Sequence, residues 1–238
     1  YTGDTITLKS DKSYFKLKGT NWDSKETLWD LFNEAHTPWE WNKILKEETE
    51  KYGMDFFSSP FDETAVDHLE EIGVTAYKVA SMEIIDIPLL KKIGSTKKPV
   101  VVSTGMASIS EIEEAIKTLK DAGATGITLL KCTSSYPAKP EDANLATIKN
   151  LAETFNVIAG LSDHTLGIAV PVTACVLGAR IVEKHFIKDR NEGGPDSLFS
   201  LEPSEFKEMI DTVRISEKSI GSVHYGGVKG EVRIFRRS

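Results

Sequence analysis

The feature that most constrains the fold is a regular alternation of short apolar runs with amphipathic segments between residues 53 and 221. The apolar runs predict six strands, at 54–58, 75–80, 99–103, 127–132, 157–161 and 179–184. Helical spacing between and after them predicts helices at 63–73, 87–93, 110–122 capped by Ser110, 143–155, 167–177 and 202–221 capped by Ser204. Strands that alternate with helices over short connections form a parallel sheet.

Two architectures accommodate such units, a doubly wound open sheet and an eight-stranded barrel. No glycine-rich dinucleotide-binding fingerprint follows any of the apolar runs, whereas polar residues follow every one of them. Polar side chains at the carboxyl ends of all strands are typical of the mouth of a barrel. The sequence therefore predicts an α/β fold, a (β/α) TIM-type barrel that is N-terminally truncated, with about six of the eight strand–helix units present.

The flanking segments differ from the alternating region. Residues 1–25 predict an irregular N-terminal segment with at most a short strand at 5–8. Residues 25–52 have helical spacing, and Thr37-Pro38 divides them into two helices, with Thr37 as the cap and Pro38 as the first helical residue. We therefore expect the partial barrel to occupy residues 26–225 and the basic stretch 226–238 to be a tail or linker.

Composition excludes several classes of function. The 238 residues carry a net charge of −7 without a basic stripe, which argues against nucleic-acid binding. No apolar run is long enough to cross a bilayer, and no signal peptide opens the chain. Cys132 and Cys175 lie in apolar runs, as buried thiols do in a reducing compartment. We expect a cytoplasmic protein, and a start at Tyr1 without methionine suggests a fragment or a processed chain.

Two histidines, His164 and His185, stand at the ends of neighbouring predicted strands, 21 residues apart. That separation is about one strand–helix unit, so both side chains are expected at the same mouth. Imidazoles placed in this way can share one divalent cation. The alternative is two unrelated polar residues at strand ends, and the pairing favours the metal.

Hydroxyl side chains follow five of the six predicted strands, and lysines accompany three of them. Hydroxyl, ammonium and backbone N–H groups together form a phosphate or carboxylate site, although a single serine there is often a helix cap. Lys78 lies inside an apolar run, so its side chain is expected to point into the barrel, where an ammonium needs an anion. Phosphate binding is the favoured role, and Schiff-base formation is the alternative.

Several motifs in chain order together resemble the sialic acid synthase family. They are residues 57–62, 77–83, 103–106, 131–137, 161–165 and 183–186, followed by Gly194-Pro195-Asp196. Two shorter pieces, Asn21-Trp22-Asp23 and residues 37–41, are more similar to the pseudaminic acid synthase branch.

The resemblance implies a transferase that condenses phosphoenolpyruvate with an open-chain amino sugar to give a nonulosonic (sialic-type) acid. Pseudaminic acid is the expected product, and N-acetylneuraminic or legionaminic acid is the alternative. The resemblance also implies a divalent metal, Mn²⁺ or Mg²⁺, on His164 and His185 that polarises the sugar aldehyde. Positions that match phosphoenolpyruvate-binding residues are Ser59, Lys78, Ser81, Ser103, Ser134 and Ser162. Positions that match catalytic residues near the sugar are Glu83, Tyr136 and Asp196.

The same resemblance implies parts that these residues do not include. Family members begin with two further strands that carry catalytic residues, and they end in an antifreeze-like domain that reaches into the active site of a homodimer partner. Residues 233–238 resemble the linker that leads into this domain. We therefore expect a homodimer for the full-length protein. A synthase fragment, a Schiff-base aldolase and a non-catalytic sugar-phosphate-binding barrel remain the three hypotheses.

Overall fold

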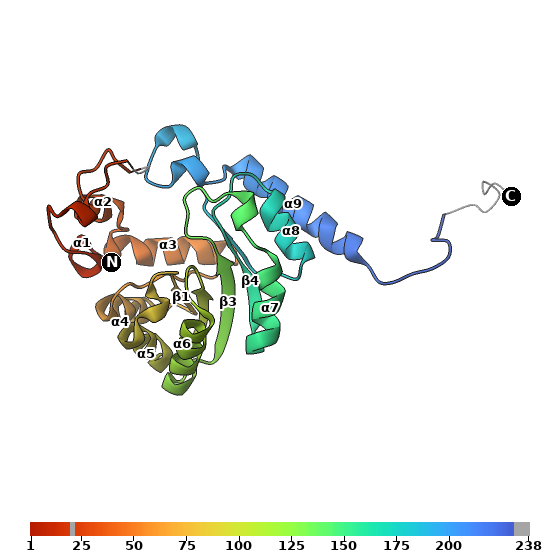
Figure 1. Cartoon of the computed structure of the whole chain (residues 1–238), viewed down its shortest axis with the longest axis horizontal. Coiled ribbons are helices and arrows are strands. Elements are labelled where there is room, and N and C mark those ends of the chain that lie inside the picture. Colours follow the sequence, from red (N-terminus) through yellow and green to blue (C-terminus); the bar gives the residue numbers. More distant parts are fainter. Residues whose placement is uncertain (20–21, 231–238) are drawn as a thin grey trace.

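The computed structural model describes residues 1–19 and 22–230, which form a curved parallel sheet covered by helices (Figure 1). The sheet contains β1 (Tyr77–Val79), β2 (Pro99–Ser103), β3 (Gly126–Cys132), β4 (Ile158–Asp163) and β5 (Val182–Lys184). Neighbours in the sheet follow chain order, β1-β2-β3-β4-β5, and every pairing is parallel. The described residues thus form a five-stranded α/β half-barrel, which confirms the predicted α/β class and parallel sheet.

Helices alternate with these strands and cover the outer face of the sheet. They are α4 (Glu63–Ile72), α5 (Ile87–Ser95), α6 (Ile109–Ala122), α7 (Ala146–Phe155), α8 (Ala169–Val176) and α9 (Pro203–Ile220). Short 3₁₀ turns lie at η1 (Ser13–Phe15), η2 (Glu83–Ile85), η3 (Pro140–Asp142), η4 (Arg190–Glu192) and η5 (Ser197–Phe199). The hydrophobic core joins helices to strands, and Tyr77, Val79 and Leu161 are strand residues in it.

The predicted strand at 54–58 is wrong as a strand. This segment makes a single parallel bridge, between Ser58 and Tyr77, in which the Lys78 N–H donates to the Ser58 carbonyl at 3.1 Å. Its apolar composition is that of a strand, but in the described part of the chain no other bridge involves it. A ladder needs successive pairs, so composition alone overstates this element.

The N-terminal segment is more regular than predicted. It contains α1 (Gly3–Ile6), where a short strand was the expectation, followed by α2 (Leu28–Ala35) and α3 (Trp39–Lys51). A tertiary contact explains α1: Gly3 packs against the Trp29 ring, whose Nε1 donates to Asp4 Oδ1 at 2.8 Å. Figure 1 shows α1 and α2 side by side. The break before α3 lies where predicted, but Pro38 is its N-cap residue rather than Thr37.

Two helix caps also differ from the prediction. Helix α6 is capped by Ser108, whose Oγ accepts from the Glu111 N–H at 3.3 Å, while the Glu111 carboxylate accepts from the Ser108 N–H at 2.7 Å. This reciprocal capping box joins Ser108 to Glu111 and starts the helix at Ile109, so Ser110 already lies inside the first turn. Helix α9 is capped by Glu202, with proline in its first turn, rather than by Ser204.

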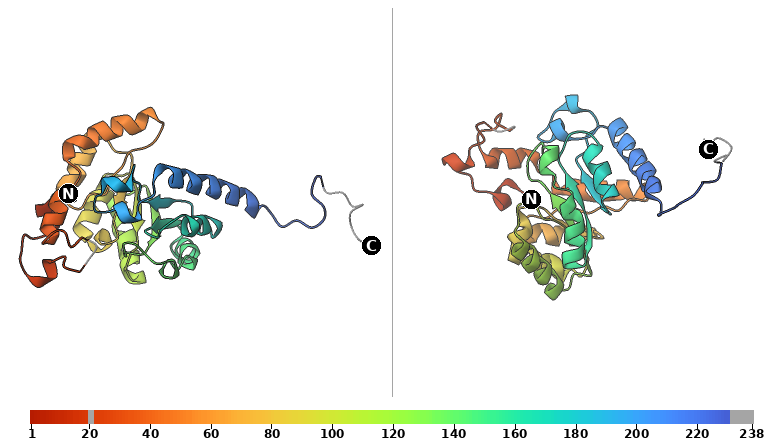
Figure 2. Two further views of the ribbon diagram at one scale, coloured as in Figure 1. Left: turned by 90° about the horizontal axis from the view of Figure 1, so that it is seen from above. Right: turned by 45° about the vertical axis from the view of Figure 1, so that its right-hand side comes forward.

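The predicted tail leaves the folded body. Residues 222–230 are exposed coil that extends beyond α9 in the views of Figure 2. Residues 231–238, including the linker-like stretch, lie outside the described residues. In the part of the chain that the structure describes, no helix combines the length and apolarity needed to span a membrane.

Candidate functional site

Lys78 lies on the inner face of the half-barrel. Its neighbours Tyr77 and Val79 point to the core under the helices, so alternation along β1 directs Lys78 inward. Its side chain is nearly buried, and Nζ donates to Ser103 Oγ at 2.8 Å and to the Val79 carbonyl at 3.0 Å. A carboxylate oxygen of Glu183 lies 3.5 Å from Nζ. Nζ therefore has three oxygen atoms of neighbouring groups around it.

Glu183 is a site residue to which the sequence analysis assigns no role. It lies on β5, where one carboxylate oxygen faces Lys78 and the other accepts from Ser162 Oγ at 2.8 Å. The available signal was its position two residues before His185, which places both on the same face of the strand. The structure thus links two of the predicted phosphate-binding residues, Lys78 and Ser162, through one carboxylate.

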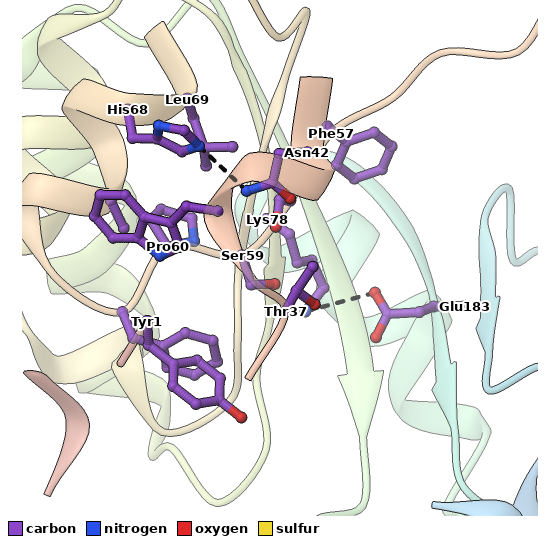
Figure 3. Close-up of a pocket in the computed structure, with 14 residues that line it drawn as sticks. Tyr1, Thr37, Asn42, Phe57, Ser59, Pro60, His68, Leu69, Lys78 and Glu183 are labelled. Atoms are coloured by element: carbon purple, nitrogen blue, oxygen red, sulfur yellow. Dashed lines mark hydrogen bonds and ion pairs between the residues drawn. The ribbon is translucent and has the colours of Figure 1, made fainter. Parts of the chain in front are cut away.

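Ser59 and Lys78 line a cavity of about 520 Å³ together with Glu183. Figure 3 shows these three side chains, from the loop before α4 and from β1 and β5, around the same space. The dashed line at Glu183 marks its ion pair with Lys78. Hydroxyl, ammonium and carboxylate groups therefore meet at the inner side of the sheet.

The loops after β1, β2 and β3 converge on a second pair of hydroxyls. Ser81 Oγ and Ser134 Oγ are 3.0 Å apart, and Gly105 lies directly against them. Gly105 has φ +48°, and a Cβ there would lie 2.5 Å from Ser81 Cβ. Glycine is required at this position because its backbone conformation is left-handed and its neighbours leave no room for a side chain.

The two histidines lie side by side, as predicted, with ring centres 5.3 Å apart. His164 is 5% exposed, and its Nδ1 is 2.8 Å from the Thr133 carbonyl, so Nδ1 carries the proton and Nε2 is left for a ligand. Burial lowers the pKa of His164, which favours the neutral ring. His185 Nδ1 lies 3.5 Å from Asp196 Oδ2.

These donors fit a divalent cation in their chemistry. A neutral imidazole with Nδ1 bound to a carbonyl is the usual form of a metal-ligating histidine. Within the described ranges, no group of three or more His, Cys, Asp or Glu side chains is arranged to hold a metal ion. A cation here would therefore take two imidazoles from the protein and its remaining ligands from water or substrate.

Aromatic rings surround the histidines. The Tyr136 ring centre is 4.3 Å from that of His164 and 5.4 Å from that of Phe199. Burial raises the pKa of Tyr136 to about 12, so its phenol stays protonated at neutral pH. The ring centres of Trp22 and Tyr136 are 6.0 Å apart, and Trp22 Nε1 donates to the Pro195 carbonyl at 2.8 Å. Asn21 of the same motif lies outside the described residues.

A larger cavity, of about 1010 Å³, lies between the N-terminal segment and the carboxyl ends of the strands. The predicted residues Glu83, Tyr136, His185 and Asp196 line it, as does Ser81. Glu83 Oε2 is buried without a hydrogen-bond partner among the described residues, and burial raises the pKa of this carboxyl. A buried carboxyl oxygen that lacks a partner beside a cavity points to a bound group that would satisfy it.

The eleven predicted residues line two cavities that share Tyr1 and Phe61 in their walls, or contact residues that line them. Ser59 and Lys78 line the smaller cavity, and Ser81, Glu83, Tyr136, His185 and Asp196 line the larger one. The four others connect to these by hydrogen bonds or ring contacts: Ser103 to Lys78, Ser134 to Ser81, Ser162 to Glu183, and His164 to Tyr136 and His185.

Comparison with known proteins agrees with this geometry. A pseudaminic acid synthase from Helicobacter pylori is 42% identical over 221 residues, which cover 93% of this chain and 65% of that relative. An N,N'-diacetyllegionaminic acid synthase from Campylobacter jejuni is 38% identical over 98% of this chain and 71% of its own length. A crystal structure of N-acetylneuraminic acid synthetase from Leptospira borgpetersenii in complex with citrate matches with a TM-score of 0.79 at 35% identity, covering 85% of this chain and 70% of that one.

These similarities confirm the resemblance to sialic acid synthases that the motifs indicate. The chain spans about 65% of the length of the pseudaminic acid synthase that it matches. The family model described as the NeuB family matches residues 1–225, which is nearly the whole chain. The chain therefore belongs to the NeuB family.

Proposed function

We propose that this chain forms the catalytic region of a pseudaminic acid synthase, a transferase that joins phosphoenolpyruvate to an open-chain amino sugar. The observation that carries the proposal is the meeting of an anion site at Lys78 with the paired imidazoles of His164 and His185. The first group suits a phosphorylated three-carbon acid, and the second suits a metal-bound aldehyde. The identity of 42% to a pseudaminic acid synthase supports this product.

Phosphoenolpyruvate would bind where Lys78 and the serines converge. The Lys78 ammonium donates to Ser103 Oγ at 2.8 Å and faces the Glu183 carboxylate at 3.5 Å, so a phosphate oxygen would take the place of that carboxylate beside Nζ. The Ser81–Ser134 pair and Ser162 add hydroxyl donors around it, and Ser59 adds another across the smaller cavity. Charge-assisted hydrogen bonds from lysine and hydroxyl groups are the interactions by which proteins hold phosphate.

His164 and His185 would hold the divalent cation, Mn²⁺ or Mg²⁺. When bound, such a cation supplies Lewis-acid polarisation of the sugar aldehyde. The protein's own contribution is to keep His164 neutral and oriented through its Nδ1 bond to the Thr133 carbonyl. The Tyr136 ring restricts the His164 ring further by packing against it.

The condensation forms one C–C bond and, from water, one new C–O bond at C2, and it breaks the C–O bond between C2 and the bridging oxygen of phosphate. C3 of phosphoenolpyruvate attacks the aldehyde carbon, water adds at C2, and inorganic phosphate leaves with the bridging oxygen. Glu83 can hold a proton in this cavity, because burial raises the pKa of its carboxyl. Tyr136 keeps its phenolic proton and can donate a hydrogen bond to the sugar. Asp196 Oδ2 lies 3.5 Å from His185 Nδ1 and can orient this ring from the side of the cavity where the sugar would bind.

Schiff-base aldolase chemistry at Lys78 is less well supported. A Schiff-base lysine needs its Nζ free to attack a carbonyl carbon, whereas Lys78 Nζ is engaged by Ser103 Oγ, the Val79 carbonyl and the Glu183 carboxylate. Borohydride trapping with pyruvate tests this directly, since only the aldolase forms a stable adduct on Lys78. A synthase of N-acetylneuraminic or legionaminic acid remains the second candidate, supported by the 38% identical relative.

The assembly around the site is also a proposal. We infer that the half-barrel is part of a TIM-type barrel in the full-length protein, and that this protein is a cytoplasmic homodimer. The greater length of the matched relatives supports the larger barrel, the free thiols of Cys132 and Cys175 fit the cytoplasm, and the homodimer follows from the family resemblance alone.

The test of function is a product assay on the full-length protein. Phosphoenolpyruvate is offered with the amino-sugar precursors of pseudaminic, legionaminic and N-acetylneuraminic acid, each with Mn²⁺ and with chelator. The proposal predicts phosphate release that requires a divalent cation and is fastest with the pseudaminic acid precursor. Faster phosphate release with another precursor would assign the protein to the branch that makes the corresponding product. Substrate binding without any phosphate release would support the non-catalytic barrel.

A further inference from the structure

The carboxyl ends of β4 and β5 carry facing residues in register. Ser162 pairs with Glu183 and Asp163 pairs with Lys184 in the parallel ladder, and His164 and His185 follow. Leu161 belongs to the core under the helices, so alternation places Asp163 on that outer face and Ser162 on the inner face. The Asp163–Lys184 ion pair therefore lies on the outer face of the sheet, and the next residues along each chain segment, His164 and His185, are directed to the inner face.

The Asp163–Lys184 ion pair is almost fully buried. Nζ lies 2.6 Å from Oδ2, and the exposed fractions of the side chains are 0% for Lys184 and 2% for Asp163. Removing two charges from water costs about as much as their attraction returns, so a buried pair of this kind is weak evidence of stabilisation. Its position next to both histidines suggests a geometrical role instead.

The remaining hydrogen bonds of the pair converge on Thr165. The N–H and the hydroxyl of Thr165 donate to Asp163 Oδ1 at 3.1 and 2.9 Å, and Lys184 Nζ donates to the Thr165 carbonyl. Thr165 directly follows His164, and Lys184 directly precedes His185. One buried cluster therefore fixes the backbone on both sides of His164 and immediately before His185.

We propose that Asp163 and Lys184 are positioning residues that set the spacing of the His164 and His185 imidazoles. This inference rests on the proposed function, because the spacing matters for a cation held between the two rings. Residues behind metal ligands typically change metal affinity by about 10–100-fold when replaced. The pair acts through the backbone of residues 163–165 and 184–185 rather than by contact with substrate.

The variant that tests this removes both charges together, Asp163→Asn with Lys184→Met. A single replacement would leave one buried charge without its partner and endanger folding. Asparagine keeps an acceptor for Thr165, and methionine keeps most of the lysine volume. The matched control is Tyr77→Phe, which removes a buried hydroxyl that donates to Glu70 Oε1 at 2.7 Å on the same outer face, away from the histidines.

Two readouts separate positioning from simple stability. The first is the nuclear Overhauser contact between the His164 and His185 ring protons in metal-free, histidine-labelled protein. The second is Mn²⁺ affinity, measured by water-proton relaxation, with thermal unfolding as the check on folding. We expect the double variant to remain folded, lose the ring contact and bind Mn²⁺ about 10–100-fold more weakly. Tyr77→Phe should keep both.

An unchanged ring contact and unchanged Mn²⁺ affinity in a folded double variant would overturn the inference. If the double variant unfolds, Lys184→Arg, which keeps the charge pair but moves its nitrogens, replaces it with the same expected loss. Absence of Mn²⁺ binding in the unmodified protein would contradict the proposed metal role. In that case the ring contact in the variants still decides whether the pair positions the histidines.

Discussion

Lys78 Nζ lies 3.5 Å from Glu183 Oε2, although β1 and β5, which carry these residues, are the two outer strands of the five-stranded sheet. Side chains from opposite edges of a flat sheet of this width could not meet, because neighbouring strands are about 4.8 Å apart. The contact between these two side chains therefore shows that the sheet is curved as in a barrel. It brings the residues after β1 and those after β5 to one site.

Replacing Lys78 tests the anion site. Lys78→Met should weaken phosphoenolpyruvate binding by about 1.5–3 kcal/mol, the range for a hydrogen bond to a charged group. Isothermal titration of the full-length protein with phosphoenolpyruvate measures this. Lys92→Met is the control, because Lys92 forms an exposed ion pair with Asp67 on the helical side. Equal affinity in the Lys78 variant would remove the assigned role.

The buried carboxyl of Glu83 predicts a pH-dependent stability. Burial raises its pKa in the folded protein, so the folded state favours the protonated form. The ionised carboxylate lowers the free energy of unfolding. This loss is absent below the ordinary pKa of glutamate in the unfolded chain and develops as pH rises through the raised pKa of the folded protein. Glu83→Gln should therefore match the unmodified protein near pH 4 and melt higher at pH 8, by about 2–4 °C per kcal/mol.

Thermal melts at the two pH values measure this difference. Glu113→Gln is the matched control, because Glu113 is exposed on α6. Glu83→Gln should also reduce turnover while it raises stability, as expected when a carboxyl is kept for chemistry. Parallel melting curves at both pH values would contradict the burial of Glu83.

Gly105 tests how closely the loops must approach. Gly105→Ala should destabilise the protein by about 1–3 kcal/mol through backbone strain, with a further cost from the contact with Ser81. Gly73→Ala is a matched control, because φ there is +73° but nothing lies within 4 Å of the added Cβ. Urea unfolding should show the larger loss for Gly105→Ala, and that variant alone should weaken phosphoenolpyruvate binding. Equal losses would mean that the loops can separate without cost.

Trp22 tests the sugar side of the larger cavity. Its bond to the Pro195 carbonyl holds the turn that carries Asp196, beside His185. Trp22→Ala should raise KM for the amino sugar several-fold and leave phosphoenolpyruvate affinity unchanged. Trp41→Ala, at a tryptophan that is 55% exposed on α3, is the control. A change in phosphoenolpyruvate affinity with an unchanged KM for the amino sugar would contradict this role, because it would place Trp22 beside phosphoenolpyruvate.

Local patterns in the sequence predicted much of this site. The strand at 99–103 has the predicted bounds, and motifs at the strand ends located eleven of the residues that lie in or beside the two cavities. Glu183 received no role, because its partner Lys78 lies across the barrel and no local pattern encodes that distance. The Thr133 carbonyl that orients His164 is a backbone group, so no side-chain motif could reveal it. Residues 54–58 have strand composition, but pairing decides whether a strand forms.

We propose that the mouth at Lys78, His164 and His185 condenses phosphoenolpyruvate with an amino sugar through C–O cleavage. The most direct measurement uses phosphoenolpyruvate labelled with ¹⁸O in the bridging position, incubated with the full-length protein, Mn²⁺ and the pseudaminic acid precursor. We predict that the label appears in the released inorganic phosphate, and that His164→Ala releases none. Label retained in the sugar acid would contradict C–O cleavage, and phosphate released equally by His164→Ala would contradict the role of this histidine.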